Sequence, residues 1–262
     1  MMATSSKSTI SSENQCWAIV PAAGIGSRMG TIVPKQYLEL NGLPVIEHSL
    51  RLLLATDWIT KVIVAVSADD ERWHNLAISK DPQVISVLGG AERVDSVTNA
   101  LSYIEQLAEE TEQHFVLVHD AARPCLGAED LTLLRQSMIT AESGLLLADK
   151  LTDTIKADDG SDSTLKKELK KVSKTVPREA LWRALTPQVF PLNLLVRALT
   201  KAENDSDKSL ITDEASAVEA LGLSPLLVQG RSDNIKITKA DDLLLASLIL
   251  QAQSSKLKKT AE

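Results

Sequence analysis

The chain has 262 residues and a mass of 28.4 kDa. It carries 28 lysines and arginines against 35 aspartates and glutamates, a net charge of −7, and 44% of its residues are hydrophobic. This composition is typical of a globular chain, and a domain of this size buries roughly three quarters of its unfolded surface. The acidic balance argues against proteins that coat nucleic acid or an anionic membrane, because such binding needs a surplus of basic residues.

The cysteine usage and the chain ends indicate a cytoplasmic protein. Cys16 and Cys125 lie far apart without a CxxC pattern, so neither a disulfide framework nor a zinc site is expected. Residues 1–15 are rich in serine and threonine, lack the apolar run of a secretory signal and are predicted to be a disordered tail. The apolar stretch at 243–250 is far shorter than the roughly 20 residues that span a bilayer.

Strand and helix patterns alternate through the first half of the chain. Short apolar runs typical of buried strands lie at residues 17–20, 61–66, 84–88, 115–118 and 144–148. Between them, apolar residues recur with helical spacing at 46–54, 94–104 and 131–138. This alternation predicts an α/β fold with a mostly parallel sheet and helices on both faces. Ligands of such sheets bind at the carboxyl ends of the strands, so the loops after Val20, Val66, Leu88 and Val118 are the candidate binding loops.

The pattern changes over residues 150–177. This segment is rich in lysine and aspartate and has too few large apolar residues for a core of its own, so it is predicted to be a protruding arm or hairpin that a partner surface stabilises. Helical and strand signals return at 192–198, 214–221, 226–228, 235–237 and 241–250. We expect a single domain over residues 16–253 and a polar, fraying tail over 254–262.

The first candidate binding loop is rich in glycine. Residues 21–30 read PAAGIGSRMG and residues 34–36 read PKQ. The spacing is GxGxxxG, which fails both the dinucleotide fingerprint and the P-loop and so disfavours an NAD-dependent oxidoreductase. Small residues after a buried strand let backbone N–H groups approach an anion. With Arg28 and Lys35 on either side, the loop predicts a cradle for a triphosphate.

The second candidate loop, residues 89–96, reads GGAERVDS. Gly90 frees the backbone there, and Arg93 or Ser96 is placed to meet a base or phosphate at the start of a helix. Asp95 and Ser96 are equally well explained as caps of that helix. Spacing does not decide between these two interpretations.

The third candidate loop, residues 118–124, reads VHDAARP. It places Asp120 where a carboxylate binds Mg²⁺ or a ribose hydroxyl. The competing interpretation is an ion pair between Asp120 and Arg123 that only shapes the loop.

The motifs taken together resemble one family. In addition to the three loops, residues 153–154 read DT, 185–188 read LTPQ, 212–216 read TDEAS and 233–236 read DNIK. In this order they resemble 2-C-methyl-D-erythritol 4-phosphate cytidylyltransferases, from Cys16 to about Leu250. The resemblance implies a Rossmann-like nucleotidyltransferase fold, CTP as substrate, Mg²⁺ bound mainly through the CTP phosphates, and a homodimer with exchanged arms. From the acidic charge balance, no nucleic-acid or membrane partner is expected.

The resemblance also assigns roles to individual residues. It implies that Arg28 and Lys35 stabilise the transition state and that Arg178 and Lys236 position the methylerythritol phosphate. The residues expected near the substrate phosphate are Arg123, Thr154 and Thr186. Those expected near the nucleotide are Ala22, Ala23, Gly24, Gly26, Gly90, Ser96 and Asp120. The sequence departs from the expected pattern at Ala91, where many relatives carry an acid, and in its lysine-rich arm.

The expected chemistry is attack of a substrate phosphate oxygen on the α-phosphorus of CTP, with loss of pyrophosphate. Two polyanions must be brought together, so the protein's task is positioning and charge neutralisation, and no protein nucleophile is needed. A phosphate monoester is already ionised at neutral pH, so His119 is expected to be structural. The alternatives are a ribitol 5-phosphate cytidylyltransferase on the same scaffold and an inactive nucleotide-binding module, for which loss of Arg28 or Lys35 would be expected.

Overall fold

The computed structural model describes residues 16–24, 33–107, 114–160, 170–204 and 211–260. The predicted tail at 1–15 lies outside these ranges. The described residues form a seven-stranded sheet with the order β11-β7-β10-β6-β1-β4-β5. Its strands are β1 (Cys16–Pro21), β4 (Ile59–Val66), β5 (Val84–Leu88), β6 (Phe115–Val118), β7 (Leu145–Lys150), β10 (Trp182–Pro191) and β11 (Leu226–Gln229).

The sheet is mostly parallel, as predicted. β1 pairs in parallel with β4 and β6, β4 with β5, and β11 with β7. Only β10 runs against its neighbours β6 and β7 within this sheet. Because the carboxyl ends of the parallel strands share one edge, the loops that follow β1, β5 and β6 come together there.

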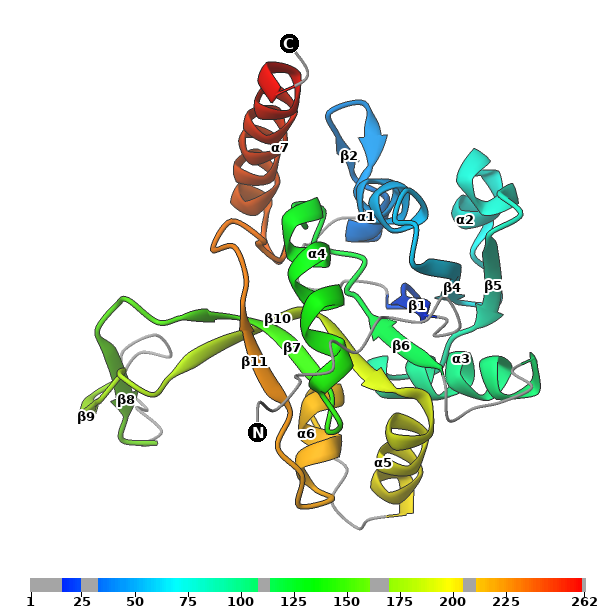
Figure 1. The fold of residues 1–262 in the computed structure, drawn as a ribbon. Coiled ribbons are helices and arrows are strands. Elements are labelled where there is room, and N and C mark those ends of the chain that lie inside the picture. The colour runs from blue at the N-terminus through cyan, green and yellow to red at the C-terminus, as the bar shows by residue number, and fades with distance from the viewer. Residues whose placement is uncertain (1–15, 25–32, 108–113, 161–169, 205–210, 261–262) are drawn as a thin grey trace, which may run out of the picture.

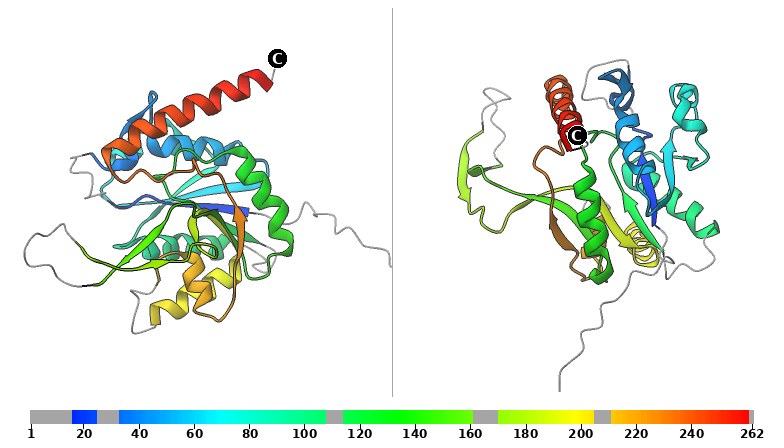
Figure 2. Two further views of the ribbon diagram at one scale, coloured as in Figure 1. Left: turned by 90° about the vertical axis from the view of Figure 1, so that its left-hand side faces the viewer. Right: turned by 45° about the horizontal axis from the view of Figure 1, so that its top comes forward.

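Helices cover both faces of the sheet (Figure 2). On one face pack α1 (Val45–Leu54), α2 (Glu71–Asn75) and α4 (Ala128–Ser137). On the other pack α3 (Arg93–Leu107), α5 (Leu192–Asn204) and α6 (Glu214–Glu219). Short elements lie between these helices and strands along the chain. They are the 3₁₀ turns η2 (Lys35–Tyr37), η3 (Ala77–Lys80) and η5 (Met138–Thr140) and the strand pair β2 (Glu39–Leu40) and β3 (Leu43–Pro44).

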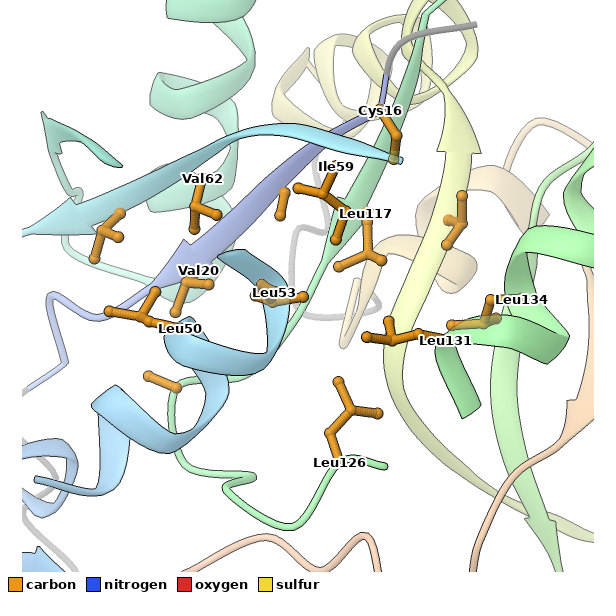
Figure 3. Packing of buried hydrophobic residues seen from close by; sticks show 14 of the residues in the cluster. Cys16, Val20, Leu50, Leu53, Ile59, Val62, Leu117, Leu126, Leu131 and Leu134 are labelled. Carbon is orange, nitrogen blue, oxygen red and sulfur yellow. The ribbon is translucent and has the colours of Figure 1, made fainter. Parts of the chain in front are cut away.

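Burial of the strands on both faces of the sheet explains why the apolar runs in the sequence are continuous. In β1, Ala18 and Val20 face the α1 side of the core, whereas Trp17 and Ile19 face the α3 side. Figure 3 shows Val20 beside Leu50 and Leu53 of α1. A strand that is covered on both faces keeps apolar residues at every position rather than at every second one.

The predicted arm is a hairpin that projects from the sheet (Figure 1). Its strands β8 (Ile155–Asp158) and β9 (Val172–Val176) pair antiparallel with each other and form a separate two-stranded sheet. All of their residues are half-buried or exposed, and Val172 is 63% exposed.

Three features differ from the sequence expectations. Residues 235–237, where a helix or strand signal was read, form neither a helix nor a strand. Strand β10 was not predicted, because Thr186, Pro187 and Gln188 interrupt the apolar pattern and its register shifts between Ala184 and Gln188. The C-terminal helix α7 (Ala240–Thr260) continues through most of the segment predicted as a polar tail. Directly before that segment, Gln253 anchors the helix by donating to the carbonyl oxygen of Cys125 at 2.9 Å. No helix in the described ranges has the length and apolar character needed to cross a bilayer.

Candidate active site

A cavity of about 240 Å³ lies where the loops after β1, β5 and β6 meet. It is the expected position for a ligand of a parallel sheet. Residues from the turn η2 and from the loop before α7 complete its wall. Of the residues singled out from the sequence, the cavity brings together Ala22, Ala23, Gly24, Lys35, Gly90, Ala91, Arg93, Ser96, Asp120 and Lys236. The loop after Val66 does not contribute to the lining.

The loop after β1 is fixed by a glutamine that the sequence analysis did not assign. Gln36 is 4% exposed, and its Nε2 donates to the carbonyl oxygens of Ala22 at 2.8 Å and Gly24 at 2.9 Å. Because Lys35 precedes Gln36, these bonds also set the lysine beside the loop. The PKQ motif was visible in the sequence, but nothing in its spacing gave the glutamine a partner. Arg28 and Gly26 lie outside the described residues, and their roles stay predictions.

The loop after β5 is shaped by its own side chains. Ser96 Oγ accepts from the N–H of Gly90 at 3.1 Å and donates to the carbonyl oxygen of Glu92 at 3.2 Å. Asp95 accepts from the N–H of Glu92 at 2.9 Å. A Cβ on Gly90 would lie 2.1 Å from that of Asp95, so only glycine fits there. The capping interpretation therefore holds for Asp95, whereas Ser96 ties the glycine loop to the helix. Gly90 and Ser96 also line the cavity.

Asp120 is surrounded by three cations. Its Oδ1 accepts from Arg93 Nε at 2.9 Å, and its Oδ2 lies 2.8 Å from Lys236 Nζ and 3.6 Å from Arg123 Nε. Burial by itself would raise the pKa of Asp120, but the charges of Arg93, Lys236 and Arg123 outweigh burial and hold that pKa well below its usual range. The ion pair with Arg123 is present, as one interpretation required, but it is only one of three contacts.

Arg123 and Thr186 lie behind Asp120 and do not line the cavity. Both are nearly buried; Thr186 Oγ1 accepts from the N–H of Asp120 at 3.1 Å, and Arg123 donates to the carbonyl oxygen of Asn234 at 2.9 Å. His119 is fully buried between them, with Nε2 3.1 Å from the carbonyl oxygen of Arg123 and Nδ1 3.0 Å from Thr186 Oγ1. A carbonyl only accepts, so Nε2 carries the proton and Nδ1 accepts from the hydroxyl.

The two remaining predicted residues lie on the arm. Thr154 and Arg178 are exposed, and neither lines the cavity. Arg178 donates to the backbone carbonyl oxygen of Thr152 and so closes the base of the hairpin. Their roles in substrate binding stay predictions.

Comparison with known proteins identifies the family. The family model for 2-C-methyl-D-erythritol 4-phosphate cytidylyltransferase (IspD) matches residues 16–252. The chain belongs to this family. A protein of that name from Shewanella amazonensis is 50% identical over 245 residues, which cover 93% of this chain and 96% of the relative. One from Serratia proteamaculans is 48% identical over 233 residues, covering 89% and 93%.

Solved structures agree with the sequence relatives. The Francisella tularensis 2-C-methyl-D-erythritol 4-phosphate cytidylyltransferase aligns with a TM-score of 0.75 at 32% identity, over 90% of this chain and 100% of that one. A 4-diphosphocytidyl-2C-methyl-D-erythritol synthase aligns with a TM-score of 0.74 at 34% identity, over 90% and 99%. The Rossmann-like cytidylyltransferase fold expected from the motifs is thereby confirmed.

The carboxylates at the cavity are the side chains that could ligate a divalent cation. No group of three or more histidine, cysteine, aspartate or glutamate side chains in the described ranges is placed to ligate a metal. Both oxygens of Asp120 already face cations, and Glu92 is the other carboxylate among the lining residues. This donor set suits a cation that arrives with a polyphosphate and takes few protein ligands, which is how Mg²⁺ usually binds.

Proposed function

We propose that this protein transfers CMP from CTP to 2-C-methyl-D-erythritol 4-phosphate, giving 4-diphosphocytidyl-2-C-methyl-D-erythritol and pyrophosphate. The observation that carries this proposal is the family membership over residues 16–252 together with a cavity that gathers the family's motif residues at the carboxyl edge of the sheet. The chain is acidic overall, yet Lys35, Arg93 and Lys236 all line this cavity. A local positive wall is what two polyanionic substrates require.

The proposed reaction needs no protein nucleophile. A phosphate oxygen of the acceptor forms a bond to the α-phosphorus of CTP, while the bond from that phosphorus to the bridging oxygen of the β-phosphate breaks and its electron pair leaves with pyrophosphate. Lys35 lies beside the glycine-rich loop and neutralises charge that builds on the transferring phosphoryl group. Lys236 also lines the cavity and binds the acceptor phosphate.

We propose Mg²⁺ as the cofactor, held mainly by the CTP phosphates. When bound, it supplies positive charge to the pyrophosphate leaving group. The chain itself contributes Asp120 to the nucleotide site. Its ion pairs with three cationic neighbours keep this carboxylate ionised. Glu92 is the lining carboxylate without an ion pair to one of these cations in the described structure.

A homodimer with exchanged arms is part of the proposal. Thr154 and Arg178 are expected to bind substrate, yet they sit on an exposed hairpin that projects from the sheet and not at the cavity of their own chain (Figure 1). An arm that reaches a second copy would bring them to that copy's active site. A two-fold axis makes the exchange mutual and the assembly closed.

A cytoplasmic location is also proposed. Cys16 and Cys125 are both free and buried, which fits a reducing compartment. Burial raises the pKa of Cys125 to about 12, so its thiol stays protonated and unreactive.

The test is release of pyrophosphate from CTP by the purified chain in the presence of Mg²⁺. We expect release with 2-C-methyl-D-erythritol 4-phosphate and little with ribitol 5-phosphate or with CTP alone. Faster release with ribitol 5-phosphate would assign the alternative acceptor. Binding of CTP without release on either acceptor would instead indicate an inactive nucleotide-binding module.

A further inference from the structure

A buried ion pair connects the cavity wall to helix α6. Glu214 begins α6, and its side chain is only 1% exposed. Its two carboxylate oxygens accept from the two terminal nitrogens of Arg93, at 2.6 and 3.0 Å. Arg93 begins α3, so this pair joins the starts of two helices that lie 121 residues apart in the chain.

Arg93 extends the connection to the active site. Its Nε donates to Asp120 Oδ1, and the other oxygen of Asp120 lies 2.8 Å from Lys236 Nζ. A planar guanidinium suits this place, because its fork holds one carboxylate with two parallel bonds while Nε reaches a second carboxylate. Glu214 therefore contacts Arg93, which contacts Asp120, which in turn contacts Lys236. A change in the position of Glu214 is transmitted along these contacts to the cavity.

Helix formation does not account for the burial of Glu214. Asp213 already caps α6 by accepting from the N–H of Ser216 at 2.9 Å. The buried Gln188 fixes the same turn to β10, through bonds to the Asp213 carboxylate at 2.8 Å and the N–H of Ala215 at 2.9 Å. A second carboxylate buried in this turn costs desolvation energy, and the hydrogen bonds of its side chain in the described structure go to Arg93 and not to the backbone N–H groups of α6. The two hydrogen bonds that Glu214 accepts from Arg93 are the contact that explains why this carboxylate is buried.

Arg93 is placed to bind a ligand. It lines the cavity, and its side chain is 29% exposed. Three of the five guanidinium N–H groups have the partners named above in the described part of the chain, which leaves two as donors to an anion or hydroxyl. Both carboxylate partners hold the pKa of Arg93 above its usual value despite burial, so the group stays charged.

We propose that Glu214 is a positioning residue that holds Arg93 at the cavity wall as a binding group for CTP. The proposal rests on the proposed function, since CTP is the ligand concerned. Without Glu214, the terminal nitrogens of Arg93 lose both fixed acceptors and the guanidinium turns toward Asp120. The donors that face the nucleotide are then lost.

The test compares Glu214→Gln with Glu219→Gln, the same change at an exposed residue of the same helix. The affinity for CTP is measured by calorimetry, and kcat and KM for both substrates by pyrophosphate release. For Glu214→Gln we expect the Kd and KM for CTP to rise about tenfold or more, with a smaller change in the KM of the acceptor. Glu219→Gln should match the parent. A folded Glu214→Gln with CTP affinity within about twofold of the parent overturns the proposal.

A double-mutant cycle tests whether Glu214 acts through Arg93. In an Arg93→Gln background, adding Glu214→Gln should weaken CTP binding no further, and fully additive losses would contradict the inference. If Glu214→Gln does not fold, Arg93→Lys decides, because an ammonium keeps the charge but cannot reach both carboxylates. Unchanged CTP affinity in that variant also overturns the proposal. Failure of the proposed function is distinguishable, because the unmodified chain would then not release pyrophosphate.

Discussion

Lys35 Nζ donates a hydrogen bond to the carbonyl oxygen of Ile237 at 3.2 Å, across 202 residues of sequence. Ile237 directly follows Lys236, and its own N–H donates to the carbonyl oxygen of Ala122 at 2.8 Å. The turn after the glycine-rich loop and the loop before α7 are thus joined at the cavity. This bond places two ammonium groups, expected to act on different substrates, in one wall.

Loss of Lys35 should slow the chemical step. For Lys35→Ala we expect kcat to fall about 10²–10³-fold, because one contact that neutralises transition-state charge is removed. The KM for CTP should change much less, and Arg28→Ala should behave in the same way. Steady-state pyrophosphate release measures both quantities. Lys61→Ala, at a half-buried lysine on β4 that does not line the cavity, is the control. Near-normal turnover in both test variants would remove them from the catalytic assignment.

Loss of Lys236 should affect the acceptor more than the nucleotide. Lys236→Ala and Arg178→Ala are expected to raise the KM for the acceptor phosphate about tenfold or more, since each removes a charge-assisted contact. Arg178→Lys should restore function only in part, because an ammonium cannot donate two parallel bonds. Equal weakening of CTP in a direct binding assay would contradict this division between the two substrates.

The sequence predicted those parts of the molecule that local patterns determine. The candidate loops after Val20, Leu88 and Val118 line the cavity because strand ends are visible as ends of apolar runs. Likewise, poor apolar content revealed the arm. The pairing of Arg93 with Glu214 was not predictable, because spacing along the chain carries no information about contacts between segments 121 residues apart.

The same limit applies to Asp120. Its position at a strand end was correct, and the ion pair with Arg123, three residues further on, was one of the two interpretations. Arg93 and Lys236, however, come from distant segments of the chain. Strand β10 was missed for a related reason. It is held by two flanking strands, and tertiary pairing of this kind overrides weak local β-propensity.

His119 should make stability sensitive to mild acid. Burial lowers its pKa to about 4, although Asp120 and the hydrogen bond to Arg123 oppose that shift. In the unfolded chain the pKa of this histidine is about 6.5, so the unfolded chain binds a proton at a higher pH than the folded one. The stability that the neutral, buried His119 contributes is therefore fully present above pH 6.5 and is lost as the pH falls from about 6.5 toward 4. By pH 4.5 the loss is on the order of 2 to 3 kcal/mol. Urea unfolding at pH 7.5 and 4.5 measures it.

The control for this effect is another histidine. His119→Gln should be less stable than the parent at pH 7.5 but should lose less on acidification. His74→Gln, at an exposed histidine of α2, should keep the parent's pH dependence. An unchanged pH dependence in His119→Gln would show that His119 is not the group responsible.

Asn234 should support the loop that carries Lys236. It is fully buried, and its Nδ2 donates to the carbonyl oxygen of Thr186 at 2.8 Å. Asn234→Ala leaves that carbonyl unpaired, so we expect a loss of about 1–3 kcal/mol in the free energy of unfolding and a raised KM for the acceptor. Asn99→Ala removes a similar bond, to the carbonyl oxygen of Leu88 at 3.0 Å, at an exposed site and should cost less. Equal losses in urea denaturation would argue against this role.

Arm exchange leads to a test that uses two impaired variants. If the arm of one chain completes the site of another, a heterodimer of Lys35→Ala and Arg178→Ala contains one intact site, with Lys35 from one chain and Arg178 from the other. Random mixing gives half heterodimers with one good site of two, so about a quarter of the parent's activity should return. The two variants are mixed under conditions that exchange subunits, and pyrophosphate release is compared with that of each alone.

Shortening the arm distinguishes exchange from mere proximity. A tight turn that joins Asp158 to Lys174 keeps Thr154, Arg178 and the pairing of residues 155–157 with 174–176, but removes residues 159–173, the part of the arm between the two strands. We expect light scattering to give the mass of a monomer and turnover to be lost, while CTP still binds because the cavity is formed by residues outside the arm. A monomer with full activity, together with no recovery in the mixed variants, would mean that Thr154 and Arg178 act within one chain. The third outcome is that activity recovers in the mixed variants and the shortened chain is still a dimer. The exchanged contacts would then lie at the base of the hairpin, where Arg178 donates to Thr152.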